Sequence, residues 1–514
     1  MGFESQKDYL PGKFHPVHLG DVLNERYHIF RKLGSGGQAT VWLARDKSVQ
    51  ERRFVAVKVF SEKSSGNELR LKEVLGRLSP QPSHPGSKHV ELALDSFVVH
   101  GPNGQHFCKV LEPLGPSLSG VLENAFDRRA DLNEPEAWLG KVLEGDTWSA
   151  KVAKRACWQI LLGLDYLHSQ RIAHRDIQPA NVCLALDYDL SSLSENEIQK
   201  AVWPTETKVE DPLPEPISPQ GSGDSFDNWE SSSDDSVGDL FWKHEREERE
   251  KFEAAQWQAF EADPGDALAE PHSAAWKKAN FLNSRSCITG LIQGPNGTLP
   301  KPGELRYIVG SWPLENIHSG FDDAETPPRL VLVDLGFACA FDECEKHPLH
   351  NLSDYRPPEG MLGIPTTHKV DIFSAGLLFW EIVMLRRLVE GRCGSDDPER
   401  IYQKNRQLRD LALRLGPMPA TLRDMWPDSD GFVDAAGNAL DMKEDLEDNG
   451  EPWGPDDFEY GDIWHHAGRR KPLDMDEEEM RVFVHLLLQM MRWDPKERPS
   501  TSELLRHEWF KKFQ

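Results

Sequence analysis

The stretch AHRDIQPANV, Ala173 to Val182, is the part of the sequence on which the interpretation of the whole chain depends. It places Asp176 five residues before Asn181. An aspartate at this spacing can orient a hydroxyl and accept its proton, while the asparagine binds a magnesium ion that bridges nucleotide phosphates. The stretch therefore predicts a loop for phosphoryl transfer. An isolated match could also be an ordinary polar loop, so other motifs are needed in the required order.

A glycine-rich hairpin is expected near the N-terminus. The segment KLGSGGQATVWLARD, Lys32 to Asp46, has the pattern of a strand, a glycine-rich turn and a second strand. Gly34, Gly36 and Gly37 carry no side chains where a backbone must approach phosphates closely, and their amides can donate to those phosphates. Such a hairpin is weak evidence by itself, because most glycine-rich hairpins are tight turns.

The next apolar strand, VAVKVF from Val55 to Phe60, contains Lys58, which is placed to hold the first two nucleotide phosphates. A solvated lysine at a sheet edge is the alternative. The segment NELRLKEVLGRL, Asn67 to Leu78, has the leucine spacing of a helix and follows a Ser-Ser-Gly break, which we take as the helix start. We expect Glu68 to pair with Lys58, with Glu73 as the reserve.

The segment FCKVLEPLG, Phe107 to Gly115, would connect two lobes, with the backbone of Glu112 and Leu114 meeting adenine and Leu111 behind it. The predicted catalytic residues are Asp176, Gln178 and Asn181, and the predicted magnesium ligands are Asn181 and Asp334. The predicted nucleotide-binding residues are Gly34, Ser35, Gly36, Gly37, Val41, Ala56, Lys58, Glu68, Glu112 and Leu114.

Four motifs follow the catalytic stretch in a fixed order. RLVLVDLGFA, Arg329 to Ala338, is a buried strand run that ends in Asp334, the expected second magnesium ligand. Next come Glu359 in RPPE, Asp371 at the head of an apolar helix, and Arg498 in WDPKERPS. We expect Glu359 and Arg498 to form an ion pair, and Asp371 to hold the backbone of the catalytic loop. Chance would rarely assemble this series.

Charge is distributed unevenly along the 514 residues. The formal net charge is -26, and the segments from Pro204 to Glu270 and from Arg423 to Glu479 each hold 19 acidic and 5 basic residues. This balance opposes binding to nucleic acid and to anionic membrane and favours basic partners. Acidic runs are equally often solvated faces.

Seven scattered cysteines without a C-x-x-C pair suggest neither a disulfide framework nor a zinc site, so we expect a reducing compartment. The N-terminus lacks the apolar core of a signal peptide, and Gln6 breaks the myristoylation pattern. The most apolar run, Ile372 to Leu385, contains Glu381 and is too short to span a bilayer. We expect a soluble intracellular protein.

The whole series resembles the eukaryotic protein kinases. GKFHPVHLGDVLNERYHIFRKLG, TVWLARD, the D-L-G form and GLDYLHSQRIAH are similar to the serine/arginine-rich-protein (SR protein) kinases, as is the long insertion before D-L-G. The resemblance implies an α+β, bilobal kinase fold with a small β-rich N-lobe and a larger, mainly helical C-lobe. The long insertion, from about Ser191 to Pro328, is rich in Pro, Ser, Asp and Glu, a composition that predicts disorder. The expected divisions are a lead-in (1–26), the N-lobe (27–112), the first part of the C-lobe with the catalytic loop (113–190), a largely disordered acidic spacer (191–327) and the second part of the C-lobe (328–514).

The resemblance further implies a serine/threonine kinase that uses ATP and Mg²⁺. Its substrates would be basic, arginine/serine-rich proteins linked to mRNA splicing, and its location cytoplasmic and nuclear. We expect a monomer without direct nucleic-acid or membrane binding. The acidic stretch Asp424 to Asp462 would be a docking surface for arginines.

Three positions depart from the family pattern. Gln178 stands where serine/threonine kinases have a lysine that touches the transferred phosphate, and its amide brings no charge. Leu352 stands where a threonine usually bonds that lysine. Arg175 is typical of kinases with a phosphorylated activation loop, yet Ser353 is the only serine or threonine between Asp334 and Glu359. Transfer could therefore be slower, tuned to another acceptor, or absent.

Two other hypotheses remain open. The rival is a catalytically weak or inactive pseudokinase, a nucleotide-binding scaffold whose acidic insertions dock basic proteins. A nucleic-acid enzyme is supported only by the short basic GRRK, Gly468 to Lys471, and the overall acidity argues against it.

Overall fold

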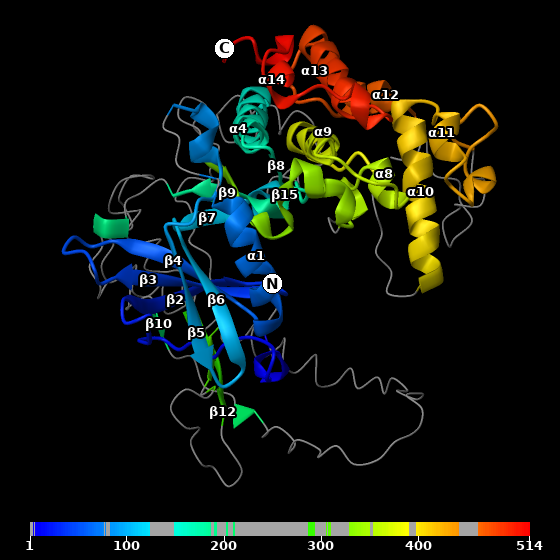
Figure 1. Ribbon diagram of the computed structural model, residues 1–514. Helices are drawn as coiled ribbons and strands as arrows, with labels where there is room; N and C mark the ends of the chain where they lie inside the picture. The colour runs from blue at the N-terminus through cyan, green and yellow to red at the C-terminus, as the bar shows by residue number, and fades with distance from the viewer. Residues whose placement is uncertain are drawn as a thin grey trace, which may run out of the picture.

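The computed structural model shows a β-rich lobe formed by the N-terminal part of the chain and a helical lobe formed by the C-terminal part (Figure 1). The residues that the structure describes are 4, 6–76, 78, 83–123, 149–186, 190–192, 202–203, 209–210, 286–292, 305, 307–309, 328–349, 353–389, 397–440 and 461–513. The expected α+β arrangement in two lobes is present.

The β-rich lobe is built on a six-stranded sheet in the order β1-β2-β3-β4-β6-β5, with all neighbours antiparallel. Its strands are β1 (Val22–Leu23), β2 (Tyr27–Ser35), β3 (Ala39–Asp46), β4 (Phe54–Phe60), β5 (Asp95–Gly101) and β6 (Gly104–Leu111). The predicted glycine-rich hairpin is the β2–β3 connection. The predicted lysine strand is β4, whose neighbours on both sides, β3 and β6, shape the site described below.

The helix of this lobe, α1 (Glu62–Leu75), begins five residues before the predicted start at Asn67. It continues through the Ser-Ser-Gly stretch that was interpreted as a break. The hydroxyl of Ser61 accepts from the backbone N–H of Ser64 at 3.3 Å, and Ser65 donates its hydroxyl to the Ser61 carbonyl at 2.8 Å. Ser61 thus stabilises the first turn, because a side-chain oxygen here satisfies an amide that has no helical partner.

The helical lobe is centred on α9 (Val370–Met384), in which every residue except Glu381 is buried. It packs against α4 (Ala150–Ser169) and α13 (Glu477–Met490). Figure 1 shows these helices side by side above the strands. The other helices are α8 (Pro358–Met361), α10 (Asp397–Leu415), α11 (Ala420–Arg423), α12 (Ile463–Arg470) and α14 (Thr501–Leu504).

Two small sheets connect the lobes and carry the catalytic segments. One has the order β14-β9-β7, from β7 (Leu114–Ser117), β9 (Val182–Ala185) and β14 (Leu330–Leu332). The other pairs β8 (Ile172–Ala173) with β15 (Cys339–Ala340). Gly163 of α4 permits close packing here, since a Cβ would lie 2.8 Å from the His89 carbonyl and 2.9 Å from Leu332 Cδ1.

Most of the predicted spacer, 191–327, lies outside the described residues, so its predicted disorder stays a prediction. Its described residues include four short strands: β10 (Val202–Trp203), β11 (Val209–Glu210), β12 (Ser286–Ile292) and β13 (Tyr307–Val309). β12 pairs with the other three, and this small sheet was missed in the sequence. The other domain boundaries also stay predictions. Among the described helices, none has the length and hydropathy needed to cross a membrane.

Candidate active site

The catalytic stretch runs from β8 through a 3-10 turn, η3 (Pro179–Asn181), into β9. Asp371, at the first turn of α9, holds its backbone. Asp371 Oδ2 accepts the N–H of His174 at 2.8 Å, and Oδ1 accepts the N–H of Arg175 at 2.7 Å. His168 Nε2 lies 2.9 Å from Oδ2. The predicted role of Asp371 is confirmed, and it fixes Arg175 at a φ of 68°, a left-handed conformation that is costly for a residue with a Cβ.

Asp176 accepts hydrogen bonds from two side-chain amides. Gln178 Nε2 donates to both carboxylate oxygens, at 2.9 and 3.0 Å, and Asn181 Nδ2 donates to Oδ2 at 2.6 Å. All three residues are buried. The structure therefore brings the three predicted catalytic residues together, and neutral donors occupy the carboxylate.

Opposing influences act on the pKa of Asp176. Burial is the largest and raises it, while the His174 ring and the two amides lower it; the net shift is upward. A raised pKa favours proton acceptance, since a general base works best when its pKa approaches the working pH.

Asp334 lies two residues after the end of β14, and its φ of 59° is also left-handed. Its Oδ1 accepts from Lys58 Nζ at 3.0 Å, which joins the β-rich lobe to the D-L-G segment. Desolvation works to raise the pKa of Asp334, but the Lys58 charge and hydrogen bond outweigh it, so the pKa falls below its ordinary value. The carboxylate is thus ionised and available to a cation.

The expected pair between Lys58 and Glu68 is not formed, so that prediction is wrong for this structure. Lys58 contacts Asp334, whereas Glu68 Oε2 lies 2.5 Å from Nζ of Lys109 on β6. The register explains this arrangement, because Lys109 is the direct cross-strand partner of Lys58. Both ammonium groups lie over the ring of Phe60, 5.2 and 5.3 Å from its centroid. The ammonium groups of Lys58 and Lys109 therefore both lie in the site, where only that of Lys58 was expected. The side chain of the reserve residue Glu73 lies outside the described ones.

Glu91 is a site residue that sequence analysis missed. Its backbone N–H donates to the Leu332 carbonyl at 2.8 Å, next to Asp334. Desolvation raises the pKa of its carboxyl group, against the lowering effects of Lys58 and Lys109 and of a hydrogen bond from the Asp334 backbone. Its signal in the sequence was a single acidic residue inside the apolar run VELAL, Val90 to Leu94.

The predicted nucleotide-binding residues surround Lys58 on the sheet. Val41 is the cross-strand partner of both Lys58 and Gly34, and Ala56 pairs with Leu111 at the end of β6. Leu114 opens β7, and Glu112 just before it is exposed and pairs with Arg329. A Cβ added at Gly34, Gly36 or Gly37 would meet nothing within 4 Å. Space therefore remains beside these glycines, and Ser35 ends β2 next to them.

The donors near Asp176 suit magnesium. The Asn181 amide nitrogen bonds Asp176, which leaves its oxygen available, and Asp334 offers a carboxylate. Mg²⁺ takes oxygen ligands and is usually held by one or two protein groups together with water and phosphate oxygens. Within the described part of the chain, no group of three or more His, Cys, Asp or Glu residues could hold a metal by itself. The residues therefore fit a metal that arrives with a nucleotide.

The end of the activation segment is anchored by a buried ion pair. Arg498 Nη1 and Nη2 donate to Glu359 Oε1 and Oε2 at 2.6 and 2.8 Å, and both side chains are nearly inaccessible. The predicted pair is confirmed. Leu352, which bears on the interpretation of Gln178, lies outside the described residues, as does the side chain of Ser353.

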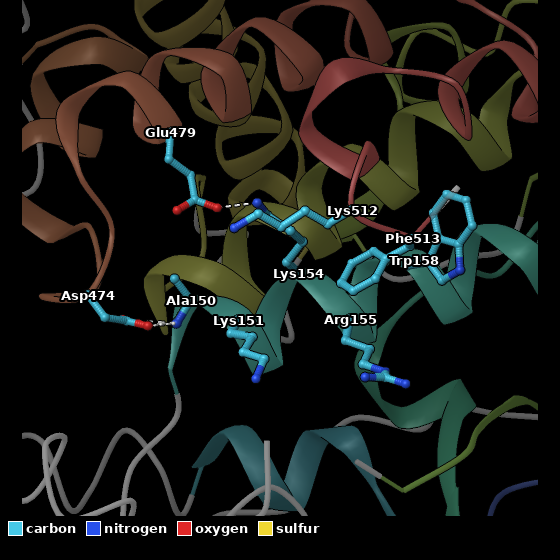
Figure 2. A pocket seen from close by; sticks show the side chains of 9 residues that line it. All are labelled: Ala150, Lys151, Lys154, Arg155, Trp158, Asp474, Glu479, Lys512 and Phe513. Carbon is cyan, nitrogen blue, oxygen red and sulfur yellow. Dashed lines mark hydrogen bonds and ion pairs between the residues drawn. The ribbon is translucent and has the colours of Figure 1, made fainter. Parts of the chain in front are cut away.

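A cleft of about 650 Å³ lies at the start of α4 in the helical lobe (Figure 2). Lys154 pairs with Glu479, and the carboxylate of Asp474 accepts the Ala150 N–H at 2.9 to 3.0 Å. The guanidinium of Arg155 lies over the Phe513 ring. Four basic residues, Lys151, Lys154, Arg155 and Lys512, line this cleft against two acidic ones, so it is a poor site for arginine-rich peptides, since like charges repel.

Comparison with known proteins agrees with this geometry. The sequence profile described as "Protein kinase domain" matches residues 131–229 and 316–510, more than half of the chain, and the interval between them falls in the predicted spacer. A serine/threonine protein kinase of Aspergillus fumigatus is 25% identical over 503 residues, covering 97% of this chain and 88% of the relative. Human SRSF protein kinase 3 is 26% identical over 559 residues, covering 98% and 90%. Protein kinase dsk1 of Schizosaccharomyces pombe is 34% identical over 191 residues, covering 36% and 31%.

Proposed function

The chain belongs to the protein kinase family, as a serine/threonine kinase similar to the SR protein kinases, and we propose that it transfers the γ-phosphate of ATP to hydroxyls in arginine/serine-rich proteins. The observation that carries the proposal is the cluster formed by Asp176, Asn181, Asp334 and Lys58. A base, two metal-binding oxygens and a phosphate-binding cation lie together there.

Each residue has a defined task in this proposal. Asp176 orients the acceptor hydroxyl and takes its proton, which its raised pKa favours. Asn181 and Asp334 would hold Mg²⁺, which supplies charge neutralisation on the phosphates when bound. Lys58 holds the phosphates from the β4 side, and the glycines between β2 and β3 cover them. Gln178 fixes the carboxylate with two neutral hydrogen bonds.

Exposed acidic residues support the choice of a basic substrate. Asp424, Asp428 and Asp430 are exposed in the segment after α11, within the acidic stretch predicted to dock arginines. Residues 441–460 of that stretch lie outside the described residues. If this surface docks substrate, Asp424→Asn/Asp430→Asn raises KM for a basic peptide and leaves kcat unchanged. The matched control is Glu477→Gln/Glu478→Gln on α13, which removes the same charge elsewhere. Equal KM values for both variants would reject the surface.

A pseudokinase scaffold is the second candidate, and Gln178 favours it. A lysine at this position would bring a positive charge to the transferred phosphate, whereas the amide brings only a dipole. The scaffold would bind ATP and basic partners without phosphoryl transfer.

Transfer of labelled phosphate to an arginine/serine-repeat peptide, an acidic peptide and an alanine-substituted repeat separates the two candidates. The kinase proposal predicts labelling of the first peptide only, and its loss in Asp176→Ala. Bound ATP with no labelled peptide would support the scaffold.

A cytoplasmic and nuclear location belongs to the same proposal, and imaging of a fluorescent fusion tests it.

A further inference from the structure

Two cysteine sulfurs lie close together in the activation segment. Cys339 Sγ and Cys344 Sγ are 3.3 Å apart, which is shorter than the van der Waals contact distance between two sulfur atoms. Cys339 belongs to β15, and Cys344 lies in the 3-10 helix η7 (Phe341–Lys346). Their exposed fractions are 5% and 0%. A disulfide has sulfurs about 2.05 Å apart, so the bond requires an approach of only about 1.3 Å.

The backbone around the two sulfurs is held on both sides. Cys339 pairs with Ala173 of β8, and the Phe341 N–H donates to the Arg171 carbonyl at 3.0 Å. The Phe341 ring stacks on His368 with centroids 3.8 Å apart, and Thr366 donates to the Cys344 carbonyl at 3.4 Å. These contacts on both sides of the two cysteines hold their sulfurs close together.

The two thiols differ from Cys108 and Cys183 in their electrostatics. The hydrogen bond from Cys344 is the largest influence on Cys339 and lowers its pKa, and Arg175 lowers it further. The pKa of Cys344 is raised, which makes it the proton donor of the pair. Burial raises the pKa of Cys108 and of Cys183 to about 12. Thiolate character, which governs reactivity, is therefore concentrated at Cys339.

This pair is coupled to the catalytic loop through Arg175. The guanidinium of Arg175 lowers the pKa of Cys339, and its Nη2 donates to the carbonyls of His347 and Pro348 at 2.6 and 3.1 Å. The backbone of Arg175 leads directly into Asp176. A change at the sulfurs therefore acts on the residue that precedes the catalytic base.

We propose that Cys339 and Cys344 form a modification site, a dithiol that peroxide converts to an intramolecular disulfide. The Cys339 thiolate attacks one peroxide oxygen, the O–O bond breaks, and the products are a sulfenic acid and, after protonation, water. The Cys344 sulfur then attacks Cys339, forming the S–S bond and releasing a second water. The dithiol loses two electrons, which reduce one hydrogen peroxide to two waters. A small dithiol reductant reverses the change by exchange.

Disulfide formation removes the thiolate of Cys339 that the Arg175 guanidinium favours, and so changes the electrostatic surroundings of the residue before Asp176. This consequence for transfer rests on the proposed kinase function, whereas formation of the bond does not. We expect oxidation to lower kcat about tenfold, equivalent to about 1.4 kcal/mol in the barrier.

The experiment treats the full-length protein with hydrogen peroxide and maps its disulfides by non-reducing proteolysis and mass spectrometry. The expected product is one peptide pair joining Cys339 to Cys344, removed by dithiothreitol. In parallel, kcat on an arginine/serine-repeat peptide falls and recovers with dithiothreitol. Cys344→Ser should keep its activity in peroxide, while Cys108→Ala, which removes a different buried thiol, should lose activity as wild type does.

Mapping on the wild-type chain needs no variant and no kinase activity, so it tests the site even if a cysteine variant unfolds or transfer is absent. Oxidation of Cys339 to sulfinic acid without the crosslink would overturn the proposal. So would a disulfide to another cysteine, or peroxide inactivation that persists in folded Cys344→Ser.

Discussion

Gln178 Nε2 donates to both carboxylate oxygens of Asp176, at 2.9 and 3.0 Å. The proposed catalytic base is therefore fixed by a neutral side chain. The hydrogen bonds orient the carboxylate, but they provide no positive charge for the phosphate that passes it. The position of the Asp176 carboxylate and the rate of phosphoryl transfer can therefore be tested separately.

Gln178→Lys is expected to raise kcat by about five- to tenfold, because a charged donor bonds a carboxylate or phosphate roughly twice as strongly as a neutral one. Initial rates at saturating ATP measure the effect. Gln170→Lys, at a site remote from Asp176 at the end of α4, is the control for added charge. Unchanged or lower kcat in Gln178→Lys would show that the missing charge does not limit transfer.

Gln178→Met should move the acidic limb of the pH profile of kcat/KM to higher pH. Hydrogen bonds to the ionised carboxylate favour that form and lower its pKa, so their removal raises the pKa of Asp176. The base is then protonated, and activity lost, at a higher pH than in wild type. Gln170→Met is the matched control. A limb that stays in place or moves to lower pH contradicts the assignment of Asp176 as base.

Asp334→Asn should remove the magnesium-dependent part of nucleotide binding. A ligand at 100 times its Kd stabilises a protein by about 2.7 kcal/mol. In wild type, the shift in Tm with ATP and Mg²⁺ should exceed the shift with ATP and a chelator. In Asp334→Asn the two shifts should be equal. Asp342→Asn, which changes an exposed aspartate in η7, is the control and should behave as wild type. If the two shifts in Tm still differ in Asp334→Asn, Asp334 is not a metal ligand.

Glu359→Gln should lower the free energy of unfolding by about 3 to 5 kcal/mol, because it leaves the Arg498 charge buried without its partner. Denaturant unfolding measures the loss. Glu497→Gln breaks the half-exposed contact to Arg492, at 3.5 Å, and should cost less than about 1 kcal/mol. Equal losses in the two variants would contradict the structural role given to the buried pair.

Sequence analysis predicted those parts of the site that depend on short motifs. The Asp371 contacts to the catalytic loop and the bidentate Arg498–Glu359 pair are both present as expected. These residues could be placed because each motif has a fixed spacing along the chain and occurs on a recognisable loop or helix start.

Contacts between distant segments could not be predicted in the same way. Glu68 pairs with Lys109 because β4 and β6 are neighbours in register, a fact set by sheet order and not by local sequence. Glu91 reaches the site through a backbone contact to Leu332, 241 residues further along the chain. The early start of α1 depended on Ser61, whose capping hydrogen bond outweighs the unfavourable helix propensity of Gly66.

The most direct test of the central claim is single-turnover transfer from ATP and Mg²⁺ to an arginine/serine-repeat peptide by wild type and Asp176→Asn, with Glu51→Gln as an exposed control. General-base catalysis contributes about 10²- to 10⁴-fold, so Asp176→Asn should lose at least about a hundredfold in rate while its Tm and ATP affinity stay near those of wild type. Transfer by Asp176→Asn at the wild-type rate would contradict the account.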